Sequence, residues 1–234
     1  MRARPFDDAI ATSQLVHGEG FDMIDEAGGW AWGRCAHDDY VGYVRADALG
    51  PAQVPTHRVT APLALVFANP DIKAPLIKAL PIGARIAGQE EGNFLRIDDG
   101  YIHRRHVAGL DVLETDPVAV AERLIGAPYR WGGRGGDGID CSGLIQRALE
   151  LSGITAPRDS DMQRDQLGET LAEDAPLRRG DLVFFPGHVG FMWDAERLLH
   201  ANAFWMSTVV EPLADVVERL RPPHAQPIIA RKRI

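Results

Sequence analysis

The chain has 234 residues, of which 45% are hydrophobic and 25% charged, so it can bury a core and is neither disordered nor collagen-like. The 25 Lys and Arg residues against 33 Asp and Glu give a net charge of −8, which disfavours a general electrostatic grip on nucleic acid or on an anionic membrane surface. No apolar run approaches the ~20 residues that cross a bilayer, and no signal-peptide pattern is visible. We therefore expect a soluble, cytoplasmic protein with no membrane insertion.

The N-terminal half has the pattern of short strands separated by glycines and acidic residues. The first strand patterns lie at 21–25, 30–35 and 40–44. A second stretch, from about 58 to 110, repeats the design. The glycine pairs of the two stretches have the same separation, and each pair is followed by an aromatic residue and a Tyr-apolar pair; they are Gly20/Gly29 and Gly83/Gly92. This pattern predicts two copies of one small all-β unit.

The C-terminal half begins with helix signals. Asp116 can cap a helix that has Pro117 at its first position and stops at Gly126. After a glycine-rich loop, Asp140 can cap a second helix that begins at Cys141. Strand patterns follow at 181–185, 188–193, 198–201, 207–210 and 227–230. Helices followed by strands indicate an α+β fold. We expect three domains, at 1–55, 56–114 and 115–234.

The residues best placed for chemistry are a cysteine and two histidines. Cys141 follows the glycine-rich loop at the first turn of a helix, where unpaired N–H groups and the helix dipole favour a thiolate and lower the cysteine pKa. The alternative is a buried small hydrophobe, which is how we assign Cys35. His188 opens a strand, and His200 ends one that can pair antiparallel with it. Both imidazoles can then lie on one face of the sheet, where His188 takes the thiol proton and His200 orients the His188 ring.

These residues lie within five ordered motifs. The motifs are Asp140-Cys141-Ser142-Gly143 after a Tyr-x-Trp-Gly-Gly loop, Pro157 to Gln163, Arg179-Gly180-Asp181 with its apolar run, Gly187-His188-Val189-Gly190-Phe191, and His200-Ala201. Together they resemble the NlpC-type cell-wall cysteine peptidases, and the N-terminal repeats resemble bacterial SH3-like domains. The resemblance implies a papain-like peptidase domain behind two SH3-like barrels, with Cys141 as nucleophile, His188 as base and His200 as the orienting third member. It also implies hydrolysis of the bond between γ-D-glutamate and a diamino acid in peptidoglycan stem peptides, without a metal or other cofactor.

The arrangement of two barrels and a peptidase resembles the recycling enzymes that accept small murein peptides with a free N-terminal L-Ala. The motif positions that would hold the free amine are Asp140, Ser142 and Ser160. Each has a structural alternative, because Asp140 can be a helix cap, Ser142 an ordinary first-turn residue, and Ser160 a cap of the segment that follows it. A buried ammonium needs a carboxylate and hydroxyl partners, so the binding reading is chemically reasonable.

Two tyrosines are further candidates for the substrate pocket. Tyr129 could help to hold the oxyanion or the substrate, or it could pack under the glycine-rich loop. Tyr40 or Tyr43 could close one side of the pocket, or each could be an ordinary strand aromatic. Two rival functions remain: a peptidoglycan-fragment-binding protein without catalysis, and an acyl transferase or amidase in which the thioester meets an amine. The presence of both a cysteine and two histidines argues against the first rival.

Overall fold

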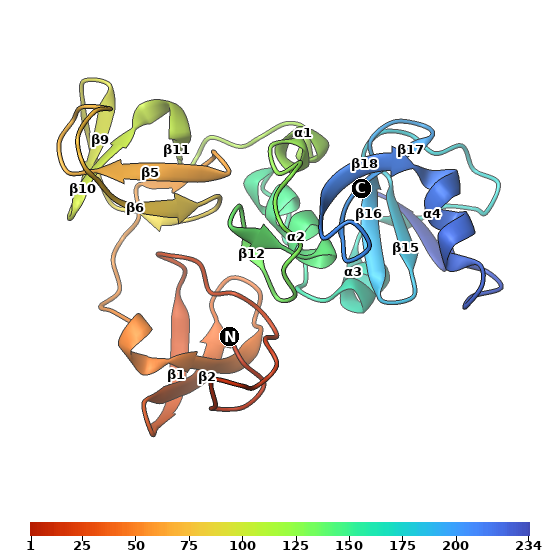
Figure 1. The fold of residues 1–234 in the computed structure, drawn as a ribbon, viewed down its shortest axis with the longest axis horizontal. Helices are drawn as coiled ribbons and strands as arrows, with labels where there is room; N and C mark the ends of the chain where they lie inside the picture. The colour runs from red at the N-terminus through yellow and green to blue at the C-terminus, as the bar shows by residue number, and fades with distance from the viewer. The chain divides into compact units, whose positions relative to one another are not determined.

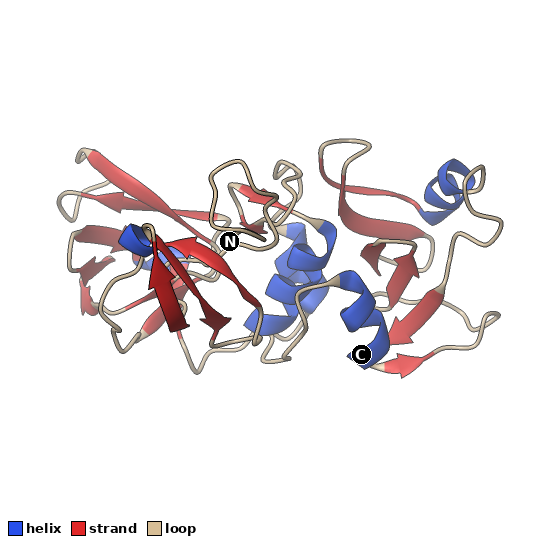
Figure 2. Ribbon diagram, turned by 90° about the horizontal axis from the view of Figure 1, so that it is seen from below, coloured by secondary structure: helices blue, strands red, loops and turns tan.

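The computed structural model describes residues 1–234, which divide into two compact units. Unit 1 comprises residues 1–113 with 134–137, and unit 2 comprises 114–133 with 138–234. All four α-helices belong to unit 2, whereas unit 1 is made of strands, loops and two short 3-10 helices (Figures 1 and 2). The predicted α+β fold class is confirmed. None of the helices combines the length and apolar composition that a membrane-spanning helix requires.

Unit 1 begins with a three-stranded antiparallel sheet. It consists of β1 (Phe21–Ala27), β2 (Trp30–Cys35) and β3 (Val41–Arg45), and the 3-10 helix η1 (Ala46–Ala48) follows. Gly28 and Gly29 form the two-residue turn between β1 and β2, with φ angles of 61° and 79°. Tight hairpin turns of this kind need positive φ at both central residues, which explains the glycine pair.

The rest of unit 1 contains two further sheets. The first has the strand order β6-β5-β10-β9-β8 and the second β11-β4-β7. The elements are β4 (His57–Val59), β5 (Leu63–Phe67), β6 (Leu76–Pro81), β7 (Arg85–Ile86), β8 (Gln89–Glu91), β9 (Phe94–Ile97), β10 (Gly100–His103), η2 (Arg104–His106) and β11 (Val107–Gly109). The succession β8, β9, β10, η2 repeats the succession β1, β2, β3, η1, with Gly92 at positive φ in the corresponding hairpin. The structure therefore contains the repeat that the glycine spacing indicates.

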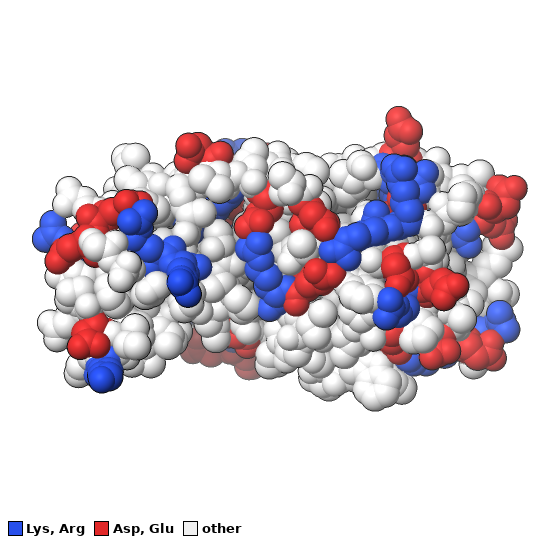
Figure 3. All heavy atoms as spheres, turned by 90° about the horizontal axis from the view of Figure 1, so that it is seen from above, with Lys and Arg blue, Asp and Glu red and all other residues white.

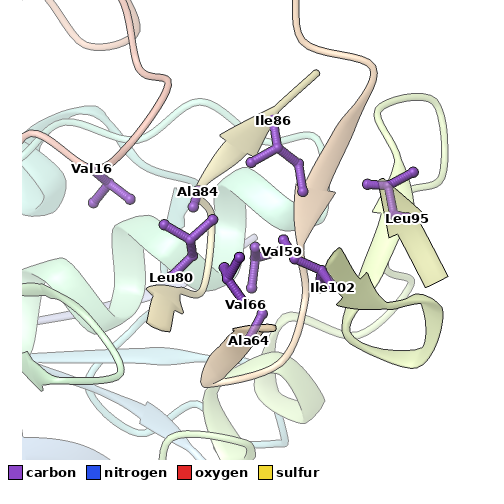
Figure 4. Close-up of a cluster of buried hydrophobic side chains, with 9 residues drawn as sticks. All are labelled: Val16, Val59, Ala64, Val66, Leu80, Ala84, Ile86, Leu95 and Ile102. Carbon is purple, nitrogen blue, oxygen red and sulfur yellow. The ribbon is translucent and has the colours of Figure 1, made fainter. Parts of the chain in front are cut away.

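The two repeats are joined through a shared core. Nine buried apolar side chains converge there, and they are Val16, Val59, Ala64, Val66, Leu80, Ala84, Ile86, Leu95 and Ile102 (Figure 4). Val16 comes from the segment before β1, whereas the other eight come from the second repeat. The backbone N–H of Arg85 also donates to the carbonyl of His17, at 2.8 Å. The predicted division at residue 55 thus falls inside one compact unit.

Unit 2 is built on a six-stranded sheet of order β14-β19-β15-β16-β17-β18. Its elements are α1 (Pro117–Glu122), β13 (Gly138–Ile139), α2 (Cys141–Leu151), α3 (Ser160–Gln166), β14 (Glu169–Thr170), β15 (Leu182–Phe185), β16 (His188–Met192), β17 (Arg197–Asn202), β18 (Ser207–Pro212), α4 (Leu213–Leu220) and β19 (Ala230–Arg233), while β12 (Arg134–Gly135) belongs to unit 1. Strand β19 begins at Ala230, which is the last residue of the predicted strand 227–230. The observed strand begins there because its pairing with β15 runs from Ala230 to Lys232. Pro227 has no N–H with which to join such a ladder.

Packing on both sides of this sheet holds unit 2 together. Helix α2 buries ten of its eleven residues and contacts β16 and β17. Helix α4 adds Val216 to a separate cluster with Val183, Phe185, Met192 and Leu198. Acidic and basic side chains are interspersed on the molecular face shown in Figure 3. Exposed ion pairs such as Arg221–Glu218, at 2.7 Å, stabilise a fold by only about 0–1 kcal/mol, so burial of apolar side chains dominates.

Candidate active site

Cys141 is the first residue of α2, as predicted from the cap before it. Asp140 has extended backbone angles, and its carboxylate accepts a hydrogen bond from the N–H of Gly143, at 2.7 Å. A side chain at Gly143 is excluded because its Cβ would lie 2.3 Å from the carbonyl oxygen of Gly133. The glycine-rich loop therefore passes directly against the first turn of α2, beside the cysteine.

The carboxylate of Asp140 is fully engaged within the protein. Its Oδ1 accepts from Gly143 N–H, from the Ser142 hydroxyl at 3.3 Å and from Arg158 Nη1 at 3.0 Å. Its Oδ2 accepts from Gly132 N–H at 2.8 Å and from Arg158 Nη2 at 2.5 Å. Arg158 and Asp140 are both buried, so this bidentate pair is a structural anchor. These contacts are those of the helix-cap alternative, and they leave no oxygen for a substrate ammonium.

The two serine candidates lie in different surroundings. Ser142 is buried, and its hydroxyl also accepts from Arg158 Nη1 at 2.8 Å, so it belongs to the Asp140 anchor. Ser160 is half-buried at the start of α3, and its hydroxyl makes no hydrogen bond within the protein. Gln163 ties this helix to α2 by donating to the carbonyl of Ser142, at 2.9 Å. Of the three residues predicted to hold an amine, Ser160 is the one with a hydroxyl open to a ligand.

The structure brings His188 and His200 together. His188 Nε2 lies 2.7 Å from His200 Nδ1, because the two residues are on the neighbouring strands β16 and β17. The pairing of Phe191 with Leu199 continues so that Gly190 lies opposite His200. A Cβ at Gly190 would lie only 3.0 Å from the Cβ of His200. Because Gly190 has no side chain, the His200 side chain has room beside it to contact His188, which is two residues before Gly190 on the same strand.

Glu211 extends this histidine pair beyond the predicted residues. Its Oε1 lies 2.9 Å from His200 Nε2, and both side chains are buried. Arg219 of α4 donates to both carboxylate oxygens, at 3.0 and 2.5 Å, and Trp205 Nε1 donates at 3.2 Å. Burial opposes ionisation of Glu211, but hydrogen bonds from His200, Arg219 and Trp205 outweigh it and hold the pKa well below its usual range. The carboxylate is therefore ionised.

An ionised Glu211 determines the proton positions along the chain of side chains. A carboxylate can only accept, so His200 Nε2 carries a proton and donates it. In the tautomer with its single proton on Nε2, His200 Nδ1 is an acceptor. His188 must then donate from Nε2 to His200 Nδ1, which leaves His188 Nδ1 with the free lone pair. Asn202 Nδ2, whose amide oxygen accepts from Trp205 N–H, also lies 3.1 Å from His200 Nε2 and could only donate to it, but the shorter contact to the charged Glu211 carboxylate at 2.9 Å is the stronger one and keeps the proton on Nε2. His188 Nδ1 is the only basic nitrogen left.

The pKa of Cys141 moves in the direction opposite to the sequence-based prediction. Burial, together with the nearby Asp140, raises the pKa of the thiol to about 11, although backbone N–H groups of Val189 and Ser142 favour the thiolate. Cys141 is only 6% exposed, so loss of hydration outweighs the helix terminus. Burial and His200 likewise lower the pKa of His188 to about 3. The resting pair is therefore a neutral thiol and a neutral imidazole.

The two tyrosine candidates are in different units. Tyr129 is half-buried in unit 2, and burial followed by Cys141 and Asp140 raises its pKa to about 12. Its hydroxyl is therefore protonated at neutral pH and can donate, and Cys141 is one of the groups that raise its pKa. Tyr40 is half-buried in unit 1, immediately before β3. The structure thus groups Tyr129 with the cysteine but assigns Tyr40 to a separate compact unit.

Comparison with known proteins agrees with this arrangement. Residues 126–215 match the NlpC/P60 family, and residues 1–49 match the bacterial dipeptidyl-peptidase Sh3 domain. The C-terminal half of the chain carries an NlpC/P60 domain. The helix that begins at Cys141 and the strand that begins at His188 both lie inside this NlpC/P60 match, as do His200 and Glu211, whereas Arg219 lies beyond it.

Several known proteins are similar to part of the chain. Dipeptidyl-peptidase 6 of Lysinibacillus sphaericus is 39% identical over 85 residues, covering 36% of this chain and 31% of the relative. Gamma-D-glutamyl-L-lysine dipeptidyl-peptidase of Bacillus cereus is 31% identical over 141 residues, covering 54% of this chain and 41% of the relative. The matches thus span less than half of each of these two relatives. The solved structure of an NlpC/P60 family protein from Bacillus cereus has a TM-score of 0.79 at 22% identity, covering 95% of this chain and 81% of that one, so the two share a fold.

Proposed function

We propose that the protein is a cysteine peptidase that hydrolyses the γ-D-glutamyl–diamino acid bond of small murein peptides. The observation that carries the proposal is the pairing of a buried thiol at the start of α2 with a hydrogen-bonded series of His188, His200 and Glu211. The series leaves a single basic nitrogen, and the thiol lies against the backbone of Val189, the residue next to that base. Such a nucleophile, base and orienting group is the arrangement that acyl transfer requires.

The first half of the reaction begins with a proton transfer. Since both groups are neutral at rest, His188 Nδ1 takes the proton from the Cys141 thiol as the sulfur attacks the scissile carbonyl carbon. The developing imidazolium is stabilised by the negative charge of Glu211, whose carboxylate holds His200 in place behind the base. The negative charge on the carbonyl oxygen faces two donors: the backbone N–H of Cys141, which has no intrahelical partner, and the protonated hydroxyl of Tyr129.

Collapse of the tetrahedral intermediate completes acylation. The C–N bond breaks, the departing amine of the diamino acid takes the proton from His188, and a thioester remains on Cys141. In the second half, His188 removes a proton from water, and the resulting hydroxide attacks the thioester. The sulfur then leaves and regains its proton from His188, which restores the neutral pair. Atoms and charges balance with water as the only co-reactant.

The choice of substrate rests on the names of the relatives and on one open hydroxyl. The Bacillus cereus relative is named for a γ-D-glutamyl-L-lysine bond, which has a diamino acid on its leaving side. Ser160 offers the unpaired hydroxyl that could receive an N–H of a free L-Ala amine. We therefore propose a soluble peptide with a free N-terminal L-Ala as substrate, which gives the enzyme a role in recycling murein peptides in the cytoplasm.

Product analysis by mass spectrometry tests the reaction. The protein is incubated with L-Ala-γ-D-Glu-diaminopimelate, with and without hydroxylamine as an amine acceptor. Release of L-Ala-D-Glu in both samples supports hydrolysis. Cleavage that occurs only when hydroxylamine is present, with the hydroxamate of L-Ala-D-Glu as its product, supports the acyl-transferase alternative. Intact peptide in both samples would refute the proposal.

A blocked substrate tests the free-amine requirement separately. N-acetylation of the L-Ala should lower kcat/KM by at least about tenfold, because it removes the charge that a buried amine site must match. Equal cleavage of the blocked and free peptides would refute the recycling role and leave the peptidase activity standing.

A further inference from the structure

A second group of reactive side chains lies in unit 1, apart from the residues used above. Cys35 ends β2, and His37 and Asp38 lie in the turn that leads to β3. One ligand atom from each residue, the thiol sulfur, a ring nitrogen and a carboxylate oxygen, lies within 4.8 Å of the other two. Cys35 is fully buried, and the side chains of His37 and Asp38 are only 11% and 2% exposed. Three different metal-binding groups therefore meet in a nearly closed space.

The imidazole of His37 is not satisfied by the protein. Both ring nitrogens are buried and neither makes a hydrogen bond, although Nε2 lies 3.1 Å from Asp38 Oδ2. Leaving a buried polar group without a partner costs free energy, and native proteins rarely do so. A cation between these atoms would give the imidazole lone pair a partner and would also neutralise the carboxylate.

The backbone of the turn holds the three groups in place. Cys35 N–H donates to the carbonyl of Tyr40 at 2.9 Å, and Asp39 N–H donates to the carbonyl of Cys35 at 3.0 Å. Tyr40 N–H donates to Asp38 Oδ1 at 3.1 Å, so Oδ2 is the oxygen directed at the imidazole. Asp39 takes a φ of 59°, which closes the turn. The ligand positions are therefore ordered before any ion arrives.

We propose that Cys35, His37 and Asp38 bind one transition-metal dication, with Zn²⁺ as the best match. Sulfur and imidazole ligands disfavour Mg²⁺ and Ca²⁺, which bind oxygen, whereas Zn²⁺ accepts sulfur, nitrogen and oxygen donors together. Binding displaces the thiol proton of Cys35 to solvent as the sulfur–metal bond forms. The Cys35 thiol donates a hydrogen bond to the Met1 thioether at 3.3 Å, so the Met1 sulfur is a side-chain atom placed to supply a fourth ligand. This assignment departs from the expectation that Cys35 is only a core residue.

The ion would strengthen the connection between β2 and β3. It would close a short loop whose two strands form the centre and one edge of the first sheet, so its binding energy would add to the stability of the folded unit. The proposed role is structural. It is independent of the peptidase proposal, since none of its ligands takes part in that reaction.

Cobalt titration of the full-length Cys141→Ala protein tests the site. This background removes the only other thiol, so a thiolate-to-cobalt absorption band can arise from Cys35 alone. We expect one equivalent of Co²⁺ to bind with that band and with the visible spectrum of a four-coordinate ion, and Zn²⁺ to displace it. His37→Ala in the same background should weaken binding at least about tenfold, while His224→Ala, which removes an imidazole elsewhere, should have no effect.

The outcomes separate the site from adventitious binding. Loss of the charge-transfer band in a Cys35→Ala/Cys141→Ala protein supports the proposal. If that double variant misfolds, the His37→Ala change, which keeps the buried Cys35 in place, still decides the question. No stoichiometric binding in the Cys141→Ala protein, or binding that is unchanged by His37→Ala, would overturn it.

Discussion

Replacing Glu211 by glutamine should slow peptide hydrolysis without changing substrate binding. In the native protein the carboxylate accepts from His200 Nε2 at 2.9 Å and is held by Arg219 and Trp205. A glutamine amide has one accepting oxygen and one donating nitrogen. When the nitrogen faces His200, the imidazole shifts its proton to Nδ1. His188 must then accept at Nε2 and carry its proton on Nδ1, which removes the base.

The size of the effect follows from the hydrogen bond that is weakened. A hydrogen bond to a charged group contributes about 1.5–3 kcal/mol, against about 0.5–1.5 kcal/mol for a neutral one. The difference is about 1–1.5 kcal/mol, and because each 1.4 kcal/mol changes a rate tenfold, we expect kcat to fall by roughly 5- to 10-fold. KM should change little, since Glu211 lies behind His200 and does not reach the substrate. Arg219 keeps a 24% exposed side chain, so water can solvate it and the fold should persist.

Steady-state kinetics with L-Ala-γ-D-Glu-diaminopimelate, together with ¹⁵N spectra of the histidine side chains, provides the assay. The spectra should show His200 protonated on Nε2 in the native protein and on a mixture of nitrogens in the variant. Glu218→Gln is the matched control, because Glu218 is an exposed carboxylate on the same helix as Arg219. Native kcat in the Glu211→Gln protein, or a loss confined to KM, would refute the reasoning.

Three further predictions concern the cysteine, the glycine and the base. Cys141→Ala should abolish turnover and change the free energy of unfolding by no more than about 1 kcal/mol, measured by product assay and urea denaturation. Gly190→Ala should destabilise the protein by about 1–3 kcal/mol and lower kcat, because its Cβ would press on His200; a stable, fully active variant would contradict the register argument. The pKa of His188 is lowered from 6.5 to about 3, so between these values only the unfolded chain binds the proton. The free energy of unfolding should therefore be independent of His188 above pH 6.5 and should fall by up to about 1.4 kcal/mol per unit as the pH drops below that value. Urea denaturation at a series of pH values measures this slope, which His188→Phe should reduce.

Much of the catalytic unit could be predicted because its signals are local. Asp140 has the cap residue type at the position where the apolar helix pattern begins, and the structure shows the cap hydrogen bond. The strand patterns that contain His188 and His200 predict two strands, and those strands pair as antiparallel neighbours. The glycine spacing of the first half indicates a repeat for the same reason, since a tight hairpin turn demands particular backbone angles within two residues.

The remaining contacts join residues with no local relation, so the sequence alone did not reveal them. Glu211 reaches His200 through the pairing of β17 with β18, and Arg219 reaches Glu211 only because α4 folds back onto the sheet. Glu211 comes directly after the predicted strand pattern 207–210, and this charged residue next to an apolar run is the one available signal. Arg158 lies inside the motif from Pro157 to Gln163, but nothing in the neighbouring sequence indicates that it donates hydrogen bonds to the carboxylate of Asp140. Its pairing depends on α3 returning to the start of α2.

The thiol shows why a local rule can give the wrong sign. A helix terminus favours a thiolate by an interaction that acts within one turn, and its strength is known mostly from exposed sites. Cys141 is instead buried, and after burial the largest influence on its pKa is the carboxylate that caps the same helix. The residue that creates the helix terminus therefore also opposes ionisation at it. Because the base beside it is neutral as well, proton transfer and attack must be coupled, and the alignment that Glu211 imposes through His200 matters more than a stored thiolate.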